Sequence, residues 1–204
     1  SPSVQPRAQR IEPVTLERDA GRFFLPGPTE IHPDVAAAML RPMISHRGTE
    51  FRALFARLQG GLRAFFATEQ PIVIVPASST ALMEMSVRAA PPGRILAMVN
   101  GAFSERFAKV ARACGRDVEQ IDVPWGRAHD LRDVERELAR TRYAAVTVVH
   151  CETSTGVLSD VQAVARLAHA HGSVVLVDAV SSAGGTPLET DAWELDFVFA
   201  GSQK

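Results

Sequence analysis

Short apolar segments alternate with longer segments of helical spacing along most of this 204-residue chain. The apolar segments are rich in valine, isoleucine and phenylalanine, residues that favour strands. Because strands separated by helices of this length form βαβ units, the alternation predicts an α/β fold, in which a mostly parallel central sheet is flanked by helices. We expect strands at residues 72–75, 94–99, 118–123, 144–150, 173–180 and 196–200.

Helices are expected between these strands. In residues 48–67 apolar side chains recur at helical spacing, although Gly60 and Gly61 interrupt the pattern at some energetic cost. No repeat, low-complexity tract or linker divides the chain, so we expect one domain at residues 23–204, preceded by an arm at residues 1–22. Further helices are expected at residues 81–89, 104–114, 130–140 and 160–171.

The composition excludes several classes of function. Lys plus Arg total 22 and Asp plus Glu total 23, so there is no electrostatic basis for binding nucleic acid or an acidic membrane. No apolar run approaches the length of a transmembrane helix. Two widely spaced cysteines, Cys114 and Cys151, are typical of free thiols in a reducing compartment, so we expect a cytoplasmic protein. His169 and His171 would diverge on a helix, and no metal site is expected.

Polar side chains follow several of the expected strands. Parallel sheets bind their ligands at this carboxyl edge. Ser78, Ser79 and Thr80 stand where a helix begins, and the free N–H groups and dipole of a helix N-terminus favour phosphate. Simple N-capping, which needs only one such residue, is the alternative.

Two more strand ends carry candidate site residues. Phe103 opens the helix after the second strand, where it fits either the core or an aromatic stacking platform. Residues 152–155, which read ETST, crowd the end of the strand at 144–150. The chemistry of a solvated loop would explain these side chains about as well as a binding site.

A carboxylate and an amine complete the candidate site. Asp178 follows four apolar residues in a central strand, where a buried carboxylate is costly unless it meets a donor or a positive charge. It either caps a local turn or pairs with a cationic ligand atom. Lys204 follows the last strand in the stretch GSQK, and a lysine that is partly removed from water loses its proton more easily and can form a Schiff base. An ordinary exposed lysine is the alternative.

An anion site, an aromatic wall, a carboxylate and an amine at one sheet edge are the groups that pyridoxal 5′-phosphate requires. The segments that carry them also resemble those of a known family, the class V aminotransferases of fold type I, and are most similar to the alanine–glyoxylate / serine–pyruvate group. The resemblance runs from about Phe23 to Lys204, and ETSTG, VDAVSS and GSQK together are highly specific. The matching segments are FFLPGPTEIHPDVAAAML, ISHRGTEF, PASSTALMEM, NGAFSERF, HCETSTGVLSD, VVLVDAVSSAGGTPLETD and DFVFAGSQK.

The resemblance implies a role for each matching residue. Lys204 would form the Schiff base with the cofactor, and Asp178 would hold the pyridine nitrogen. Val180 and Phe103 would press on the two faces of the ring. Close relatives also carry an aromatic residue, often Trp, at the place of Phe103. They often have glycine within the turn at residues 78–80, so Ser79 is a mild departure. The other implied contacts are Ser78, Ser79, Thr80 and Gln203 at the phosphate, Thr153 at the ring hydroxyl, and Pro26 and Gly27 at the substrate end.

The implied function is transamination, by a homodimer, between a small L-amino acid such as alanine or serine and a 2-oxo acid such as glyoxylate or pyruvate. Two alternatives stay open. A class V lyase such as a cysteine desulfurase would share the cofactor site but should offer a histidine stacker and a cysteine in a mobile loop. A remnant of the fold without turnover is the other. Because the family continues past this lysine, we also expect that residues 23–204 are the large, cofactor-binding domain, cut at Lys204, and that a small C-terminal domain is missing.

Overall fold

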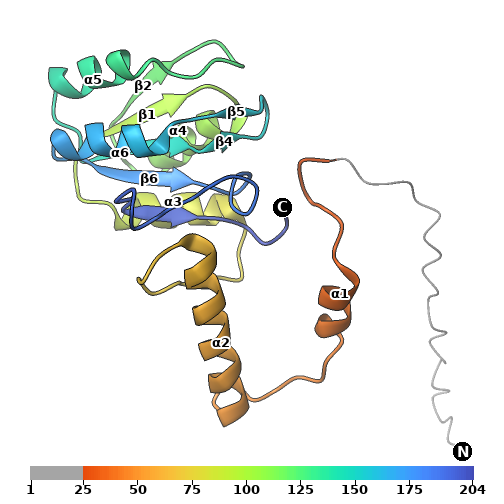
Figure 1. The fold of residues 1–204 in the computed structure, drawn as a ribbon. Coiled ribbons are helices and arrows are strands. Elements are labelled where there is room, and N and C mark those ends of the chain that lie inside the picture. Colours follow the sequence, from red (N-terminus) through yellow and green to blue (C-terminus); the bar gives the residue numbers. More distant parts are fainter. Residues whose placement is uncertain (1–24) are drawn as a thin grey trace, which may run out of the picture.

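A parallel sheet forms the centre of the molecule. The structure, a computed structural model, describes residues 25–204. All pairings within the five-stranded sheet are parallel, and the strand order is β2-β1-β3-β6-β7 (Figure 1). The α/β class expected from the sequence is therefore confirmed. The strands are β1 (Ile95–Val99), β2 (Val118–Asp122), β3 (Ala145–Val149), β6 (Val174–Asp178) and β7 (Phe197–Phe199).

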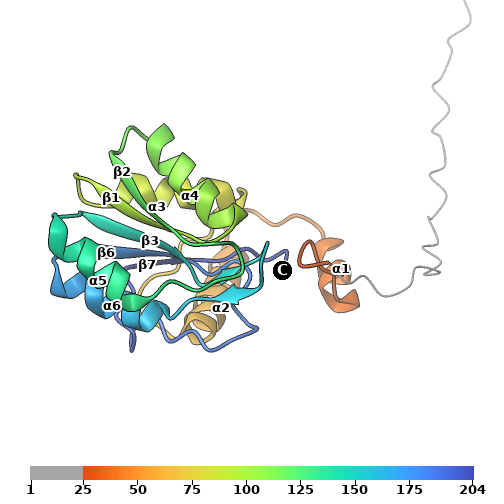
Figure 2. The ribbon, with the colours of Figure 1, turned by 90° about the horizontal axis from the view of Figure 1, so that it is seen from above.

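Two pairs of helices cover the two faces of the sheet (Figure 2). α3 (Ser79–Ala89) and α4 (Ala102–Ala113) lie on one face, and α5 (Leu131–Arg140) and α6 (Val161–Ala170) lie on the other. Every residue of β1 and β3 is buried, because central strands covered on both faces carry continuous rather than alternating apolar side chains. This sandwich fixes the strand ends from which the polar side chains project.

The segment before the sheet packs differently. α1 (Pro33–Met39) lies away from the sheet in Figure 1, whereas α2 (Thr49–Phe66) projects from it, with Phe66 at its C-terminal end packed against the core; neither helix has a fully buried residue. The helix expected over residues 48–67 is present as α2 and continues through both of its glycines. The sequence did not predict α1. The arm expected at residues 1–22 lies outside the described residues.

One expected strand is wrong. Residues 72–75 are not paired with any strand of the described chain, and Val73 and Ile74 are 75% and 49% exposed. The side chain of Gln59 takes the place of a neighbouring strand at Ile72, donating to its carbonyl at 2.6 Å and accepting from its N–H at 3.1 Å. A β-branched run favours extended backbone, but a strand exists only where a partner satisfies its polar groups.

The other five expected strands are confirmed within two residues at each end. A short antiparallel hairpin, β4 (Cys151–Glu152) and β5 (Val157–Leu158), follows β3 and was not predicted. Across residues 25–204, no helix combines the length and the apolar character needed to cross a membrane.

Candidate active site at the carboxyl edge of the sheet

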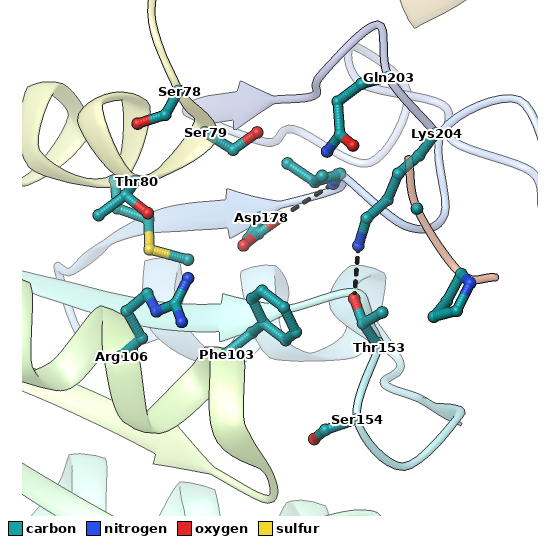
Figure 3. A pocket seen from close by; sticks show the side chains of 14 residues that line it. Ser78, Ser79, Thr80, Phe103, Arg106, Thr153, Ser154, Asp178, Gln203 and Lys204 are labelled. Carbon is teal, nitrogen blue, oxygen red and sulfur yellow. Dashed lines mark hydrogen bonds between the residues drawn. The ribbon is translucent and has the colours of Figure 1, made fainter. Parts of the chain in front are cut away.

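A cavity of about 420 Å³ lies where β6 and the residues after β7 meet the first turns of α3 and α4 (Figure 3). The cavity brings together all of the site residues that the sequence predicted, although they come from widely separated parts of the chain. They are Pro26, Gly27, Ser78, Ser79, Thr80, Phe103, Thr153, Asp178, Val180, Gln203 and Lys204.

Lys204 reaches into this cavity rather than into solvent (Figure 3). Its Nζ donates to Thr153 Oγ1 at 2.8 Å and to Ser181 Oγ at 2.6 Å, and it lies 5.0 Å from the centre of the Phe103 ring. Partial burial lowers the pKa of the lysine, and the nearby carboxylate of Asp178 partly opposes that effect. The interpretation of Lys204 as an ordinary exposed charge is therefore wrong.

Asp178 is the last residue of β6 and is only 4% exposed. Its Oδ1 accepts one hydrogen bond, from the N–H of Val180 at 2.9 Å. Burial raises the pKa of this carboxyl to about 6, because the Val180 N–H and the charge of Lys204 only partly replace water. Asp178 thus both caps a local turn and presents an incompletely satisfied carboxylate to the cavity.

The N-terminus of α3 forms the opposite end of the cavity. Ser78 is the N-cap, with its side-chain oxygen accepting from the N–H of Ala81 at 3.4 Å. Within the described chain, neither the N–H groups nor the hydroxyls of Ser79 and Thr80 have a hydrogen-bond partner. Helix N-termini with such unused donors bind anions, so this end of the cavity suits a phosphate.

The walls of the cavity come from Phe103, in the first turn of α4, and from Val180, which is 8% exposed. The guanidinium of Arg106, one turn further along α4, lies 5.1 Å from the centre of the Phe103 ring. An apolar side chain and an aromatic ring from different layers can hold a flat ligand between them.

The segment at residues 26–29 closes the cavity next to the lysine. The N–H of Thr29 donates to the carbonyl of Gln203 at 3.0 Å. Gly27 has a φ of +142°, and a Cβ atom at this position would lie 2.7 Å from Cε of Lys204. Glycine is required here both by the backbone conformation and by the close approach of the lysine.

Sequence reasoning missed four polar or apolar neighbours of the site. Met83 and Arg106 line the cavity because each stands three residues, about one helical turn, after a predicted site residue, Thr80 and Phe103 respectively. Ser154 lines it beside Thr153, and Ser181 contacts both Thr153 and Lys204. The helical spacing was a usable signal for the first two, and the stretch VDAVSS for Ser181.

Glu152 was noticed in the sequence only as part of a crowded loop, yet it is completely buried beside the cavity. Its Oε2 accepts from the N–H of Ser104 at 2.9 Å and its Oε1 from Ser154 Oγ at 2.7 Å. Burial alone would raise the pKa of this carboxyl, but these and other donors outweigh it, and the pKa lies below its ordinary value.

The remaining sequence expectations concern cysteines and metals. Cys114 and Cys151 are free thiols, as predicted, and both are partly buried. Among the described residues, no three His, Cys, Asp or Glu side chains lie close enough together to hold a metal ion.

Known proteins with related sequences and folds resemble this chain over most of its length. The sequence profile of the family described as "Aminotransferase class-V" matches residues 29–204. The soluble hydrogenase small subunit of Synechococcus is 35% identical over 92% of this chain and 50% of that protein. The serine–glyoxylate aminotransferase of Methylorubrum extorquens is 36% identical over 94% of this chain and 50% of that protein.

A solved structure shows the same relationship in three dimensions. The crystal structure of an alanine–glyoxylate aminotransferase from Nostoc superposes with a TM-score of 0.84 at 37% identity, covering 88% of this chain and 48% of that one. The chain therefore spans about half the length of the relatives it matches. Since the family profile matches most of the sequence and the fold agrees, the chain belongs to the class V aminotransferase family of fold type I.

Proposed function

We propose that this chain binds pyridoxal 5′-phosphate through Lys204 and catalyses transamination between a small L-amino acid and a 2-oxo acid. The observation that carries the proposal is the environment of Lys204. Its amine has a lowered pKa, is held by two hydroxyls, and shares a cavity with the buried Asp178. A lysine that loses its proton easily is a better nucleophile toward an aldehyde than one in water.

The chemistry of the cavity fits this cofactor. The unused donors at the start of α3 suit the phosphate, and Gln203 lies at the same cavity. Asp178 offers a carboxylate to a protonated pyridine nitrogen, and such a positive charge would replace the solvation that the carboxylate lacks. Phe103 and Val180 supply the two apolar surfaces that a flat ring requires.

The residues of this chain would then divide the work. When bound, the cofactor supplies an electron sink that allows the α-proton of an amino acid to leave. Asp178 would favour the protonated form of the pyridine nitrogen by opposing its charge. Lys204 would hold the cofactor and, as a free amine, would be the base that accepts the α-proton of the substrate and later returns a proton. Thr153 and Ser181, its two hydrogen-bond partners, hold the amine in place for both tasks.

The proposed acceptor is glyoxylate or pyruvate, and the proposed donor is L-alanine or L-serine. The names of several relatives support glyoxylate: an aspartate–glyoxylate, a serine–glyoxylate and an alanine–glyoxylate aminotransferase are 32–36% identical to this chain. The same names differ in the amino donor, so the donor rests on the resemblance rather than on a contact in the cavity. Residues 26–27 would lie at the substrate end.

We also propose that the active form is a homodimer and that the large, cofactor-binding domain lies within residues 23–204. The relatives support this only by analogy, because the chain spans about half of their length. α1 and α2, which bury no residue of their own, offer surface for a second subunit. Sedimentation of the active protein would test the dimer, and an active monomer would contradict it.

The experiment that tests the function begins with cofactor loading. Incubation with pyridoxal 5′-phosphate should give a visible absorbance band, and reduction with borohydride followed by peptide mapping should place the adduct on Lys204. A panel of amino acids and 2-oxo acids should then show amino transfer with L-alanine or L-serine and glyoxylate. Release of sulfide from L-cysteine without amino transfer would favour the lyase, and binding without any turnover would favour a non-catalytic remnant.

A further inference from the structure

Glu152 is the one completely buried carboxylate next to the cavity, and the proposed function does not use it. It sits at the end of β4, in the hairpin that follows β3. No Lys or Arg group lies within ion-pairing distance of it in the described part of the chain. A buried, unpaired charge is costly, so its hydrogen bonds must account for its presence.

Five donors surround this carboxylate. Oε1 accepts from the N–H of Phe103 at 3.2 Å, from the N–H of Ser154 at 3.2 Å and from Ser154 Oγ at 2.7 Å. Oε2 accepts from the N–H and the Oγ of Ser104, both at 2.9 Å. A carboxylate accepts about four hydrogen bonds at its lone pairs, so Glu152 is saturated in its ionised form.

Hydrogen bonds from Glu152 and its neighbour Ser154 cap the N-terminus of α4. The first three N–H groups of the helix belong to residues 102–104 and have no partner within it. Ser154 Oγ accepts from the first, at 3.0 Å, and Glu152 accepts from the other two. The second of the three is the N–H of Phe103, whose ring forms a wall of the cavity. The carboxylate therefore fixes the backbone from which that ring projects.

The same carboxylate fixes the loop on the other side of the cavity. Thr153 lies between Glu152 and Ser154 in the chain, and its Oγ1 accepts from Lys204 Nζ at 2.8 Å. Gly101 shows how closely the two elements approach, because a Cβ atom there would lie 2.4 Å from Cγ of Glu152. The φ of Gly101 is 176°, an extended value open to any residue, so the requirement for glycine comes from contact and not from conformation.

We propose that Glu152 is a positioning residue for the active site. Its ionised carboxylate joins the start of α4 to the loop after β4, and it thereby sets the Phe103 ring and the Thr153 hydroxyl on two sides of Lys204. The inference rests on the proposed function in so far as these two side chains hold the cofactor. Because Glu152 contacts neither the cavity nor the lysine, it acts only through its neighbours and through its charge.

The test replaces Glu152 with glutamine, which keeps the shape but removes the charge and turns two donors toward backbone N–H groups. We expect the dissociation constant for pyridoxal 5′-phosphate to rise about tenfold, the size of effect that follows when buried donors lose their acceptor. We also expect the pH midpoint for labelling of the Lys204 amine in the cofactor-free protein to fall, because the carboxylate of Glu152, like that of Asp178, supports the positive charge of the lysine.

A matched control separates positioning from general stability. Asp160→Asn makes the same change from carboxylate to amide at the N-cap of α6, where Oδ1 accepts from the N–H of Ala163 at 2.9 Å. It should leave both readouts at the wild-type value even if its melting temperature falls. If Glu152→Gln also lowers only the melting temperature, with affinity within twofold and the labelling midpoint unchanged, Glu152 is a structural cap and the proposal is wrong.

A second variant keeps the test decisive if Glu152→Gln does not fold. Ser104→Ala removes the hydroxyl donor to Oε2 and leaves both backbone bonds from α4 to Glu152 in place, although it also removes the acceptor of the N–H groups of Asn100 and Gly101. We expect a weakening of cofactor affinity of about threefold, in line with the loss of one hydrogen bond. No change in affinity would contradict the proposal. Failure of the wild-type protein to bind the cofactor would overturn the proposed function alone, because the labelling of Lys204 needs no cofactor.

Discussion

Two buried carboxylates stand within one small region of this molecule, and they differ in almost every physical respect. Asp178, at the end of β6, accepts a single hydrogen bond, and burial raises its pKa to about 6. Glu152, at the end of β4, accepts five, and its donors hold its pKa below the ordinary value although burial alone would raise it.

The protein itself satisfies the hydrogen-bonding capacity of Glu152, whereas it leaves that of Asp178 largely unsatisfied. The saturated carboxylate of Glu152 stabilises the fold around it without any further partner. The carboxylate of Asp178 is destabilised in its charged form and gains free energy from any cation that enters the cavity. Incomplete solvation of a buried acid, rather than burial itself, is therefore the feature that marks a binding position.

The largest effect is expected from removal of the charge of Asp178. In the transamination proposed above, replacement by asparagine should lower the rate of amino transfer from L-alanine by about 10²- to 10³-fold, the range seen when one electrostatic contact to a reacting group is lost. Rapid-mixing absorbance measurements would follow the reaction. Asp160→Asn is the control and should react at the wild-type rate. A near-normal rate in Asp178→Asn would show that Asp178 is only a turn residue.

The next largest effect should follow when a neighbouring residue displaces the carboxylate of Glu152. In Gly101→Ala the new methyl group would lie 2.4 Å from Cγ of Glu152 and 2.6 Å from Ser154 Oγ, so the carboxylate must leave its five donors. We expect the free energy of unfolding to fall by about 2–4 kcal/mol. Urea denaturation of the cofactor-free protein would measure it.

Gly60→Ala provides the contrast for that experiment. Gly60 lies inside α2, and no atom lies within 4 Å of the place where its Cβ would stand. The substitution should therefore raise the free energy of unfolding by about 0.5–1 kcal/mol through helix propensity alone. Opposite signs of the two changes would show that contact with Glu152, and not the replacement of glycine by alanine as such, destabilises Gly101→Ala.

The two carboxylates also show which parts of the site could be predicted from the sequence and which could not. Asp178 could be predicted because a single acid after four apolar residues is a local pattern, and so could the strand that carries it. Glu152 could not, because three of its five hydrogen bonds come from Phe103 and Ser104, about fifty residues earlier in the chain, at the start of α4. A side chain that is satisfied by distant backbone groups leaves no signal in its own neighbourhood.

The same reasoning explains the one wrong strand and the correct fold class. The central strands β1, β3 and β6 could be predicted from their apolar runs, since helices cover the sheet on both faces. Residues 72–75 have an equally apolar run, but their pairing depends on what lies beside them, and the side chain of Gln59 satisfies Ile72 instead. Composition predicts which segments are able to form strands, whereas partners decide which of them do.

A smaller effect of the same substitution, Asp178→Asn, is expected on the free energy of unfolding. Without cofactor, the ionised carboxylate of Asp178 destabilises the folded state because it is poorly solvated. Asparagine has no charge to solvate. Asp178→Asn should therefore raise the free energy of unfolding of the cofactor-free protein at pH 8 by about 1–3 kcal/mol, the energy equivalent of the raised pKa. Thermal and urea unfolding would measure it. A destabilised variant would mean that the Val180 hydrogen bond outweighs the charge.

The pH dependence of these variants gives the smallest effect and the strictest test, because the two carboxylates should respond with opposite signs. The pKa of Asp178 is raised by folding to about 6, so the folded state binds the extra proton, and its contribution to stability is present at pH 4 and is lost as the pH rises through 6. The pKa of Glu152 is lowered by folding, so its contribution is present above its unfolded pKa and is lost as the pH falls through the folded value.

It follows that the stability advantage of Asp178→Asn over the wild type should shrink toward zero as the pH is lowered from 8 to 4, since protonated Asp178 carries no charge to solvate. The disadvantage of Glu152→Gln should persist at every pH above the ordinary pKa of a glutamate and diminish below it, as the pH falls through the lowered pKa of the folded state. Urea unfolding of the three cofactor-free proteins in one series of buffers would measure both differences. If the two differences change in parallel with pH, both carboxylates titrate alike, and the distinction between a satisfied and an unsatisfied buried acid would not hold for this site.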